Sequence, residues 1–104
     1  MIKTVTKELK SKAIVSSKVE GFYVYILRTS ANTLYIGQTN NLEKRMAEHK
    51  SKTIKSSKYV RSFPSFELVY SEQFETRSEA LKREYALKQL TKIQKEKLIQ
   101  RLQS

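Results

Sequence analysis

Tyr23-Val-Tyr-Ile-Leu-Arg28 and Leu34-Tyr-Ile-Gly-Gln-Thr39 are the stretches that decide the fold. Both are rich in aromatic and β-branched residues, and a short Ser-Ala-Asn-Thr connection precedes the second, a pattern typical of a β-hairpin. Successive strand residues face opposite sides of a sheet, so we expect an aliphatic set facing a core and a tyrosine set facing away. The aliphatic set is Val24, Ile26, Leu34 and Ile36, and the tyrosine set is Tyr23, Tyr25 and Tyr35. Gly37 permits a tight turn or a close approach to the backbone.

The segments after the hairpin predict a helix, a loop and a third strand. Asn40 or Asn41 is a suitable N-cap for a helix over residues 42–50, with Leu42 and Met46 toward the core. Residues 51–64 carry serines and cations without an acidic residue and end at Pro64, which indicates a surface loop. Residues 66–74 alternate imperfectly and predict a strand that pairs with the hairpin.

Two capping-box signatures predict the remaining helices. Thr76 with Glu79 opens a helix that runs to about Leu90, and Thr91 with Gln94 opens the last one. We expect the last helix to pack its four large aliphatic residues, which are Ile93, Leu98, Ile99 and Leu102.

These elements predict an α+β fold in which helices flank a small three-stranded antiparallel sheet. We expect helices on one face of the sheet and an open tyrosine face that meets a substrate. Residues 1–20 form a basic N-terminal tail in this interpretation, and residues 21–104 form the domain.

The strongest global feature is the charge, with 21 Lys and Arg against 10 Asp and Glu, a net +11. Such an excess favours a polyanion, most often nucleic acid. A solvated lysine-rich surface or a ribosome-associated protein that prefers RNA is the alternative. No long apolar run predicts a membrane span, and the start shows no signal-peptide core, so we expect a cytoplasmic protein.

The residue inventory excludes most standard catalytic sites. The chain has no cysteine, only His49 as histidine and only two glycines, which excludes thiolate and multi-histidine metal sites and a glycine-rich phosphate loop. Glu84 lies on or beside the apolar face of its helix. It is a candidate single-carboxylate Mg²⁺ ligand, although an ion pair with Lys88 is the simpler interpretation. Arg45 and His49, four residues apart, form a stripe beside the hairpin, where a solvated arginine is the simpler interpretation.

Four sequence blocks, in the same order, resemble the motifs of the GIY-YIG endonuclease superfamily. The chain is most similar to a compact single-domain member of that superfamily. They are Tyr23-Val-Tyr with Tyr35-Ile-Gly37, Asn41-Leu-Glu-Lys-Arg-Met-Ala-Glu-His49, Leu68-Val-Tyr70, and Ser78-Glu-Ala-Leu-Lys-Arg-Glu84 with the ending through Ile99. The chain departs from the family name where Tyr23 replaces the first glycine. It also carries Gln38 where many members have a lysine, which removes a cation near Tyr35.

The resemblance implies a metal-dependent endonuclease that hydrolyses DNA, by nicking or by structure-selective cleavage, in DNA repair or recombination. The family's two motif tyrosines fall on Tyr25 and Tyr35, its helix arginine on Arg45 and a further active-site residue on His49. Glu84 takes the position of the glutamate that binds one Mg²⁺ or Mn²⁺. Tyr35 would activate the attacking water, with a hydrogen bond to Tyr25.

We further expect DNA contacts from residues around this site. They are Tyr23, Gln38, Lys52, Lys55, Lys58 and Arg61. The alternative function is a catalytically silent basic DNA- or RNA-binding module on the same fold.

Overall fold

The computed structural model describes residues 21–52 and 56–103, so the predicted tail and Lys55 lie outside the described residues. The strands are β2 (Phe22–Thr29), β3 (Leu34–Thr39) and β4 (Phe66–Phe74). The helices are α1 (Leu42–Ser51), α2 (Lys58–Arg61), α3 (Arg77–Lys88) and α4 (Lys92–Gln103). The predicted α+β class, with a three-stranded antiparallel sheet flanked by helices, is confirmed.

The sheet has the order β3-β2-β4, with both neighbours antiparallel to β2. In the hairpin, Tyr25 lies opposite Gly37. Between β2 and β4 the register shifts at Ile26 and Leu27, which leaves Val69 as an extra residue. This bulge explains why the adjacent residues Val69 and Tyr70 both pack into the same core, which regular alternation forbids.

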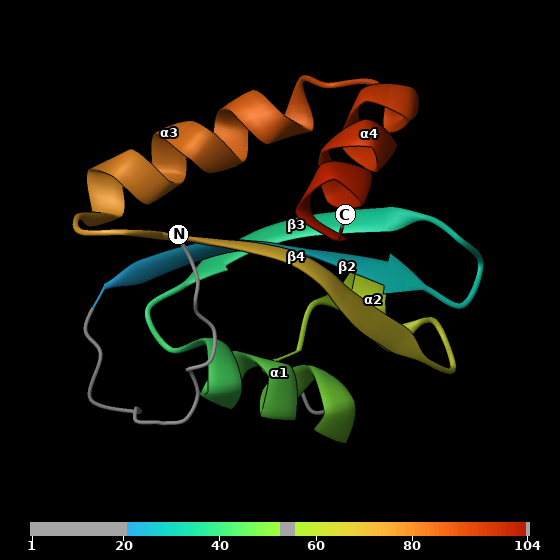
Figure 1. Ribbon diagram of the computed structural model, residues 1–104. Coiled ribbons are helices and arrows are strands. Elements are labelled where there is room, and N and C mark those ends of the chain that lie inside the picture. The colour runs from blue at the N-terminus through green and yellow to red at the C-terminus, as the bar shows by residue number, and fades with distance from the viewer. Residues whose placement is uncertain (1–20, 53–55, 104) are drawn as a thin grey trace.

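Helices cover both faces of the sheet (Figure 1). On one face, α3 and α4 pack against the aliphatic side chains of the hairpin, as expected. The core residues there are Val24, Ile26, Ile36, Val69, Tyr70, Ala80, Leu87 and Ile99. In contrast to the expected packing of the last helix, Ile93 is 70% exposed and Leu102 is 56% exposed. The sheet meets α4 through Ile99 and through a forked ion pair between Arg28 and Glu96 instead.

The prediction of an open tyrosine face was wrong. Tyr25 is only 1% exposed because it packs with Leu27 and Val60 in a second core. The half-buried Leu42 and Met46 of α1 pack against this core, as the spacing predicted. The segment expected to be a surface loop contributes α2, which brings Val60 beneath the sheet.

Both predicted capping boxes are formed. Thr76 accepts a hydrogen bond from the Glu79 amide while the Glu79 side chain accepts one from the Thr76 amide, and Thr91 and Gln94 repeat this exchange. Asn41 is the N-cap of α1. These local bonds fix the starts of the helices that carry Arg45, His49 and Glu84.

Candidate active site

Helix α1 presents Arg45 and His49 to the tyrosine face of the sheet. Its start is fixed by Asn41, whose side chain accepts a hydrogen bond of 3.0 Å from the Lys44 amide. Because Arg45 and His49 are one helical turn apart, both reach the same strand. His49 is fully buried and Arg45 is half-buried.

The hydroxyl of Tyr25 joins these two residues. The Arg45 Nε–H donates to it at 3.3 Å, and it lies 3.0 Å from His49 Nε2. Since the guanidinium can only donate, we assign the Tyr25 proton to the bond with Nε2. His49 Nδ1 then carries the ring proton and donates to Ser56 Oγ at 3.1 Å. The chain of donors runs from Arg45 through Tyr25 and His49 to Ser56.

Gly37 makes room for the Tyr25 ring. A Cβ atom at position 37 would lie 2.6 Å from the Tyr25 Oη and 2.7 Å from its Cζ. Of the two roles that the sequence left open for this glycine, the structure shows the close approach. The glycine of Tyr35-Ile-Gly37 therefore permits the position of Tyr25, the tyrosine of the opposite strand.

Tyr35 is half-buried among aromatic rings. Its ring centroid lies 6.4 Å from that of Tyr25 and 5.9 Å from that of His49, and it stacks on Tyr59 at 6.1 Å with an interplanar angle of 16°. The expected hydrogen bond with Tyr25 is not formed, because the Tyr25 hydroxyl is engaged by Arg45 and His49. Within the part of the chain that the structure describes, the Tyr35 hydroxyl has no hydrogen-bond partner and is available to a ligand.

Burial sets the protonation of the inner pair. It raises the pKa of Tyr25 to about 12, an effect that the Arg45 hydrogen bond opposes and the charge of Glu84 increases. Burial, helped by the charge of Arg45, lowers the pKa of His49 to about 4. Both groups are thus neutral at pH 7. Burial also disfavours the charged form of Arg45, but its hydrogen bonds to Tyr25 and Glu48 outweigh this and raise its pKa.

The buried neutral imidazole predicts a stability change in mild acid. In the unfolded chain His49 binds a proton near pH 6.5, whereas in the folded chain it does so only near pH 4. Stability is therefore complete above pH 6.5 and falls by about 3 kcal/mol as the pH drops to 4. Urea unfolding at pH 7.5, 6, 5 and 4.5 should show this loss, and His49→Gln should remove most of it. A midpoint independent of pH between 7 and 4.5 would contradict a buried neutral His49.

Glu84 lies in α3, in the layer opposite α1. Its side chain is 18% exposed and pairs with Lys88 Nζ at 3.0 Å, so the simpler sequence interpretation, an ion pair, is present. Its charge also acts on the Tyr25 hydroxyl, which places the carboxylate within electrostatic reach of the site built on α1. The ion pair with Lys88 is therefore compatible with the other interpretation, in which Glu84 is a metal ligand.

The donor set fits one divalent cation that keeps most of its water. Within residues 21–52 and 56–103, no three His, Asp or Glu side chains gather as a metal site. Mg²⁺ commonly binds one or two carboxylates and completes its shell with waters and substrate phosphate oxygens. Glu84, partly buried and with its charge acting on Tyr25, meets that requirement.

The predicted DNA-contact residues have different surroundings. Tyr23 is half-buried on β2, and burial raises its pKa. Lys52 is the C-cap of α1 and donates to the carbonyl oxygens of Phe63 and Pro64 at 2.7 and 3.2 Å, so it also holds the segment after α2. Lys58 is exposed at the start of α2, and the half-buried Arg61 ends it. Lys55 lies outside the described residues.

Sequence reasoning did not select Tyr59 or Ser56 for the site. Tyr59 stacks on Tyr35 and donates to Thr33 Oγ1 at 2.6 Å, while Ser56 binds the His49 ring. Interleaved aromatic and basic residues were the available signal. That signal does not say that the segment folds under the sheet.

Comparison with known families supplies the identification. The model of the GIY-YIG catalytic domain matches residues 21–97, which contain every element from β2 to α3 and the first half of α4. The chain belongs to the GIY-YIG family. This membership places it with nucleases that act on nucleic acid.

Two relatives match this chain over most of their own length. The chain is 47% identical over 81 residues to the UPF0213 protein OB0043 of Oceanobacillus iheyensis, covering 78% of this chain and 92% of that protein. It is 48% identical over 77 residues to the UPF0213 protein CPE1444 of Clostridium perfringens, covering 74% and 81%.

Two solution NMR structures share the GIY-YIG-like fold of the chain. The protein EF2693 of E. faecalis is 37% identical with a TM-score of 0.57, covering 82% of this chain and 88% of that one. The UPF0213 protein BH0048 of Bacillus halodurans is 35% identical with a TM-score of 0.51, covering 77% and 83%.

Proposed function

We propose that this GIY-YIG protein is a divalent-metal-dependent endonuclease that hydrolyses DNA phosphodiester bonds, by nicking or by structure-selective cleavage. The observation that supports it is the convergence on Tyr25. Arg45 binds its hydroxyl, Tyr35 packs beside its ring, and the charge of Glu84 acts on it from the other helical layer. A phenol and a guanidinium thus meet at one point, with a carboxylate within electrostatic reach.

Each group has a role in hydrolysis. In its phenolate form, Tyr35 accepts a proton from the attacking water. Arg45 holds a nonbridging phosphate oxygen, an interaction that strengthens as charge develops in the transition state. Glu84 would hold Mg²⁺ or Mn²⁺, which when bound stabilises negative charge on the phosphate and on the departing 3′ oxygen.

Tyr25 and His49 act as positioning residues in this proposal. Tyr25 stays protonated because its pKa is about 12, and His49 is fully buried, so neither is suited to contact the phosphate. Their hydrogen bonds hold the Nε of Arg45 toward the strand pair. The orientation of the guanidinium is therefore set before substrate binds.

DNA is the proposed partner because of the net charge of +11 and the cations on and near α2. Lys58 and Arg61 would contribute phosphate contacts that weaken with salt and do not read bases. Among the described residues, no helix is long and apolar enough to cross a membrane. A cytoplasmic location and a role in DNA repair or recombination remain predictions.

The decisive experiment is a metal-dependence assay on two DNA forms. Purified protein should convert supercoiled plasmid to open circles, and should cut a labelled forked duplex, only when Mg²⁺ or Mn²⁺ is present. EDTA should stop cleavage, and added metal should restore it. Cleavage that persists in EDTA would contradict the proposal.

The alternative is a silent DNA- or RNA-binding module, and the ion pair between Glu84 and Lys88 favours it because it already neutralises the carboxylate. It predicts tight binding in EDTA, with no cleavage at any metal concentration. Competition between RNA and DNA at matched salt then identifies the preferred nucleic acid.

A further inference from the structure

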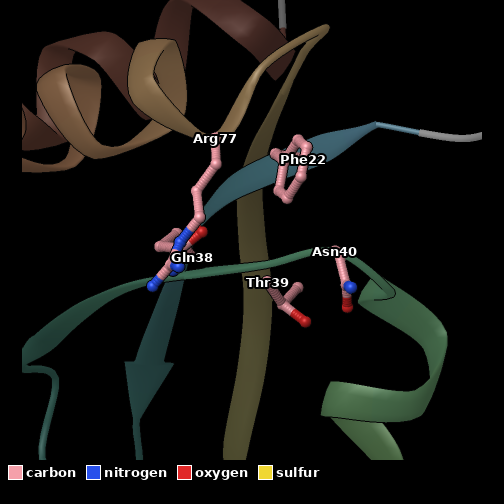
Figure 2. Close-up of a pocket in the computed structure, with 5 residues that line it drawn as sticks. All are labelled: Phe22, Gln38, Thr39, Asn40 and Arg77. Atoms are coloured by element: carbon pink, nitrogen blue, oxygen red, sulfur yellow. The ribbon is translucent and has the colours of Figure 1, made fainter.

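A hollow of about 310 Å³ lies at the start of α3, outside the tyrosine cluster. It is lined by Phe22 of β2, Gln38 and Thr39 of β3, Asn40 and Arg77. Figure 2 shows the Arg77 side chain descending from the first turn of α3 toward β3, where Gln38 lies, with the Phe22 ring across the hollow. An aromatic face, two amides, a hydroxyl and a guanidinium thus share one space.

Two polar groups in this hollow lack partners in the part of the chain that the structure describes. Gln38 Oε1 is buried and makes no hydrogen bond, the one buried side-chain polar atom of the described residues in that state. No ion pair or hydrogen bond engages the Arg77 guanidinium within the same ranges. A buried acceptor without a donor is costly, so a ligand that supplies one would gain from binding here.

The hollow adjoins the candidate active site along two elements. Gln38 directly follows Gly37, which contacts Tyr25. Arg77 and Glu84 are seven residues apart in α3, which places them on the same helix face and about 10 Å apart along its axis. One nucleic-acid strand can reach both.

We propose that this hollow binds an unstacked nucleobase, a guanine, of the strand whose phosphate enters the candidate active site. The inference rests on the proposed function. Phe22 offers a surface for stacking, and the Arg77 fork matches the O6 and N7 acceptors of guanine. When the Gln38 amide turns into the hollow, the guanine N1–H and amino group supply the donors that its Oε1 lacks. A phosphate group suits the hollow less well, because it carries no N–H donor for Gln38.

The test measures binding in EDTA, so that hydrolysis plays no part. A fluorescent forked DNA is made with an abasic site at each position in turn, and affinity is read by anisotropy. At one position of the scan, removal of the base should weaken binding about tenfold, which is the size of a base–aromatic stacking contact. At that position guanine should bind at least about fivefold more tightly than adenine, and 7-deazaguanine, which lacks the N7 acceptor, should fall between them.

Three variants assign the effect to the hollow. Arg77→Ala, Gln38→Met and Phe22→Leu should each reduce the abasic penalty to less than about threefold, with folding checked by circular dichroism. The charge-matched control is Lys82→Ala, which removes an exposed cation of the same helix outside the hollow. It should weaken binding to all forks equally and keep the full penalty.

An abasic scan that stays within twofold at every position would overturn the inference, as would a penalty unchanged in all three hollow variants or a preference for adenine. These results are separate from those of the metal assay. Base-dependent binding without cleavage supports the base pocket and contradicts the proposed nuclease activity. Cleavage without base-dependent binding supports the nuclease activity and contradicts the base pocket.

Discussion

Replacing Glu84 with glutamine should lower metal-dependent nicking at least about a hundredfold, while DNA binding in EDTA and the unfolding midpoint stay close to those of the parent protein. The substitution keeps the size of the side chain and removes its charge. A bound divalent ion contributes several kcal/mol of transition-state stabilisation, and a neutral amide holds such an ion poorly. Plasmid nicking rates across a Mg²⁺ and Mn²⁺ titration, together with anisotropy in EDTA, measure the two effects.

Lys88→Gln is the matched control, because it breaks the same ion pair from the other side. The pair spans one helical turn and its lysine is 53% exposed, so its loss costs only a few tenths of a kcal/mol in either variant. If the carboxylate acts through a metal, Lys88→Gln keeps its nicking activity and Glu84→Gln does not. Equal activity in Glu84→Gln and the parent would remove Glu84 from the site and favour the silent binding module.

The sheet and the helix starts were predictable because their signals are local. The hairpin alternation and the box formed by Thr76 and Glu79 each involve residues within a few positions of one another. The coverage of the tyrosine face was not predictable in this way. It depends on Val60 in the four-residue helix α2, a segment too short to show helical periodicity.

In the candidate site, too, the local features were predictable and those set by tertiary packing were not. The helical spacing of Arg45 and His49 predicted that they lie together beside the hairpin. The complete burial of His49 depends on Ser56 and Tyr25, which no spacing rule connects. For Glu84 the sequence left two interpretations open, since its nearness to Tyr25 is set by how α3 packs on the sheet. The resemblance to a family, unlike periodicity, carries such long-range information.

Tyr35→Phe should reduce the nicking rate by a factor of about 10² to 10⁴, the usual contribution of a positioned general base. Only the hydroxyl is removed, and the ring keeps its contacts with Tyr25, His49 and Tyr59. Because that hydroxyl makes no hydrogen bond within the described residues, we expect the free energy of unfolding to change by less than about 0.5 kcal/mol. Single-turnover nicking with saturating protein separates this chemical effect from binding.

The same substitution on the stacked neighbour supplies the control. Tyr59→Phe loses a hydroxyl that binds Thr33, and its ring, 43% exposed, can still stack on Tyr35. If the tyrosine cluster serves only to pack the sheet against α1 and α2, both variants should nick at the parental rate. If Tyr35 accepts the proton of the attacking water, only Tyr35→Phe should be slow, with metal affinity and DNA affinity unchanged. A parental rate in Tyr35→Phe would remove Tyr35 as the base.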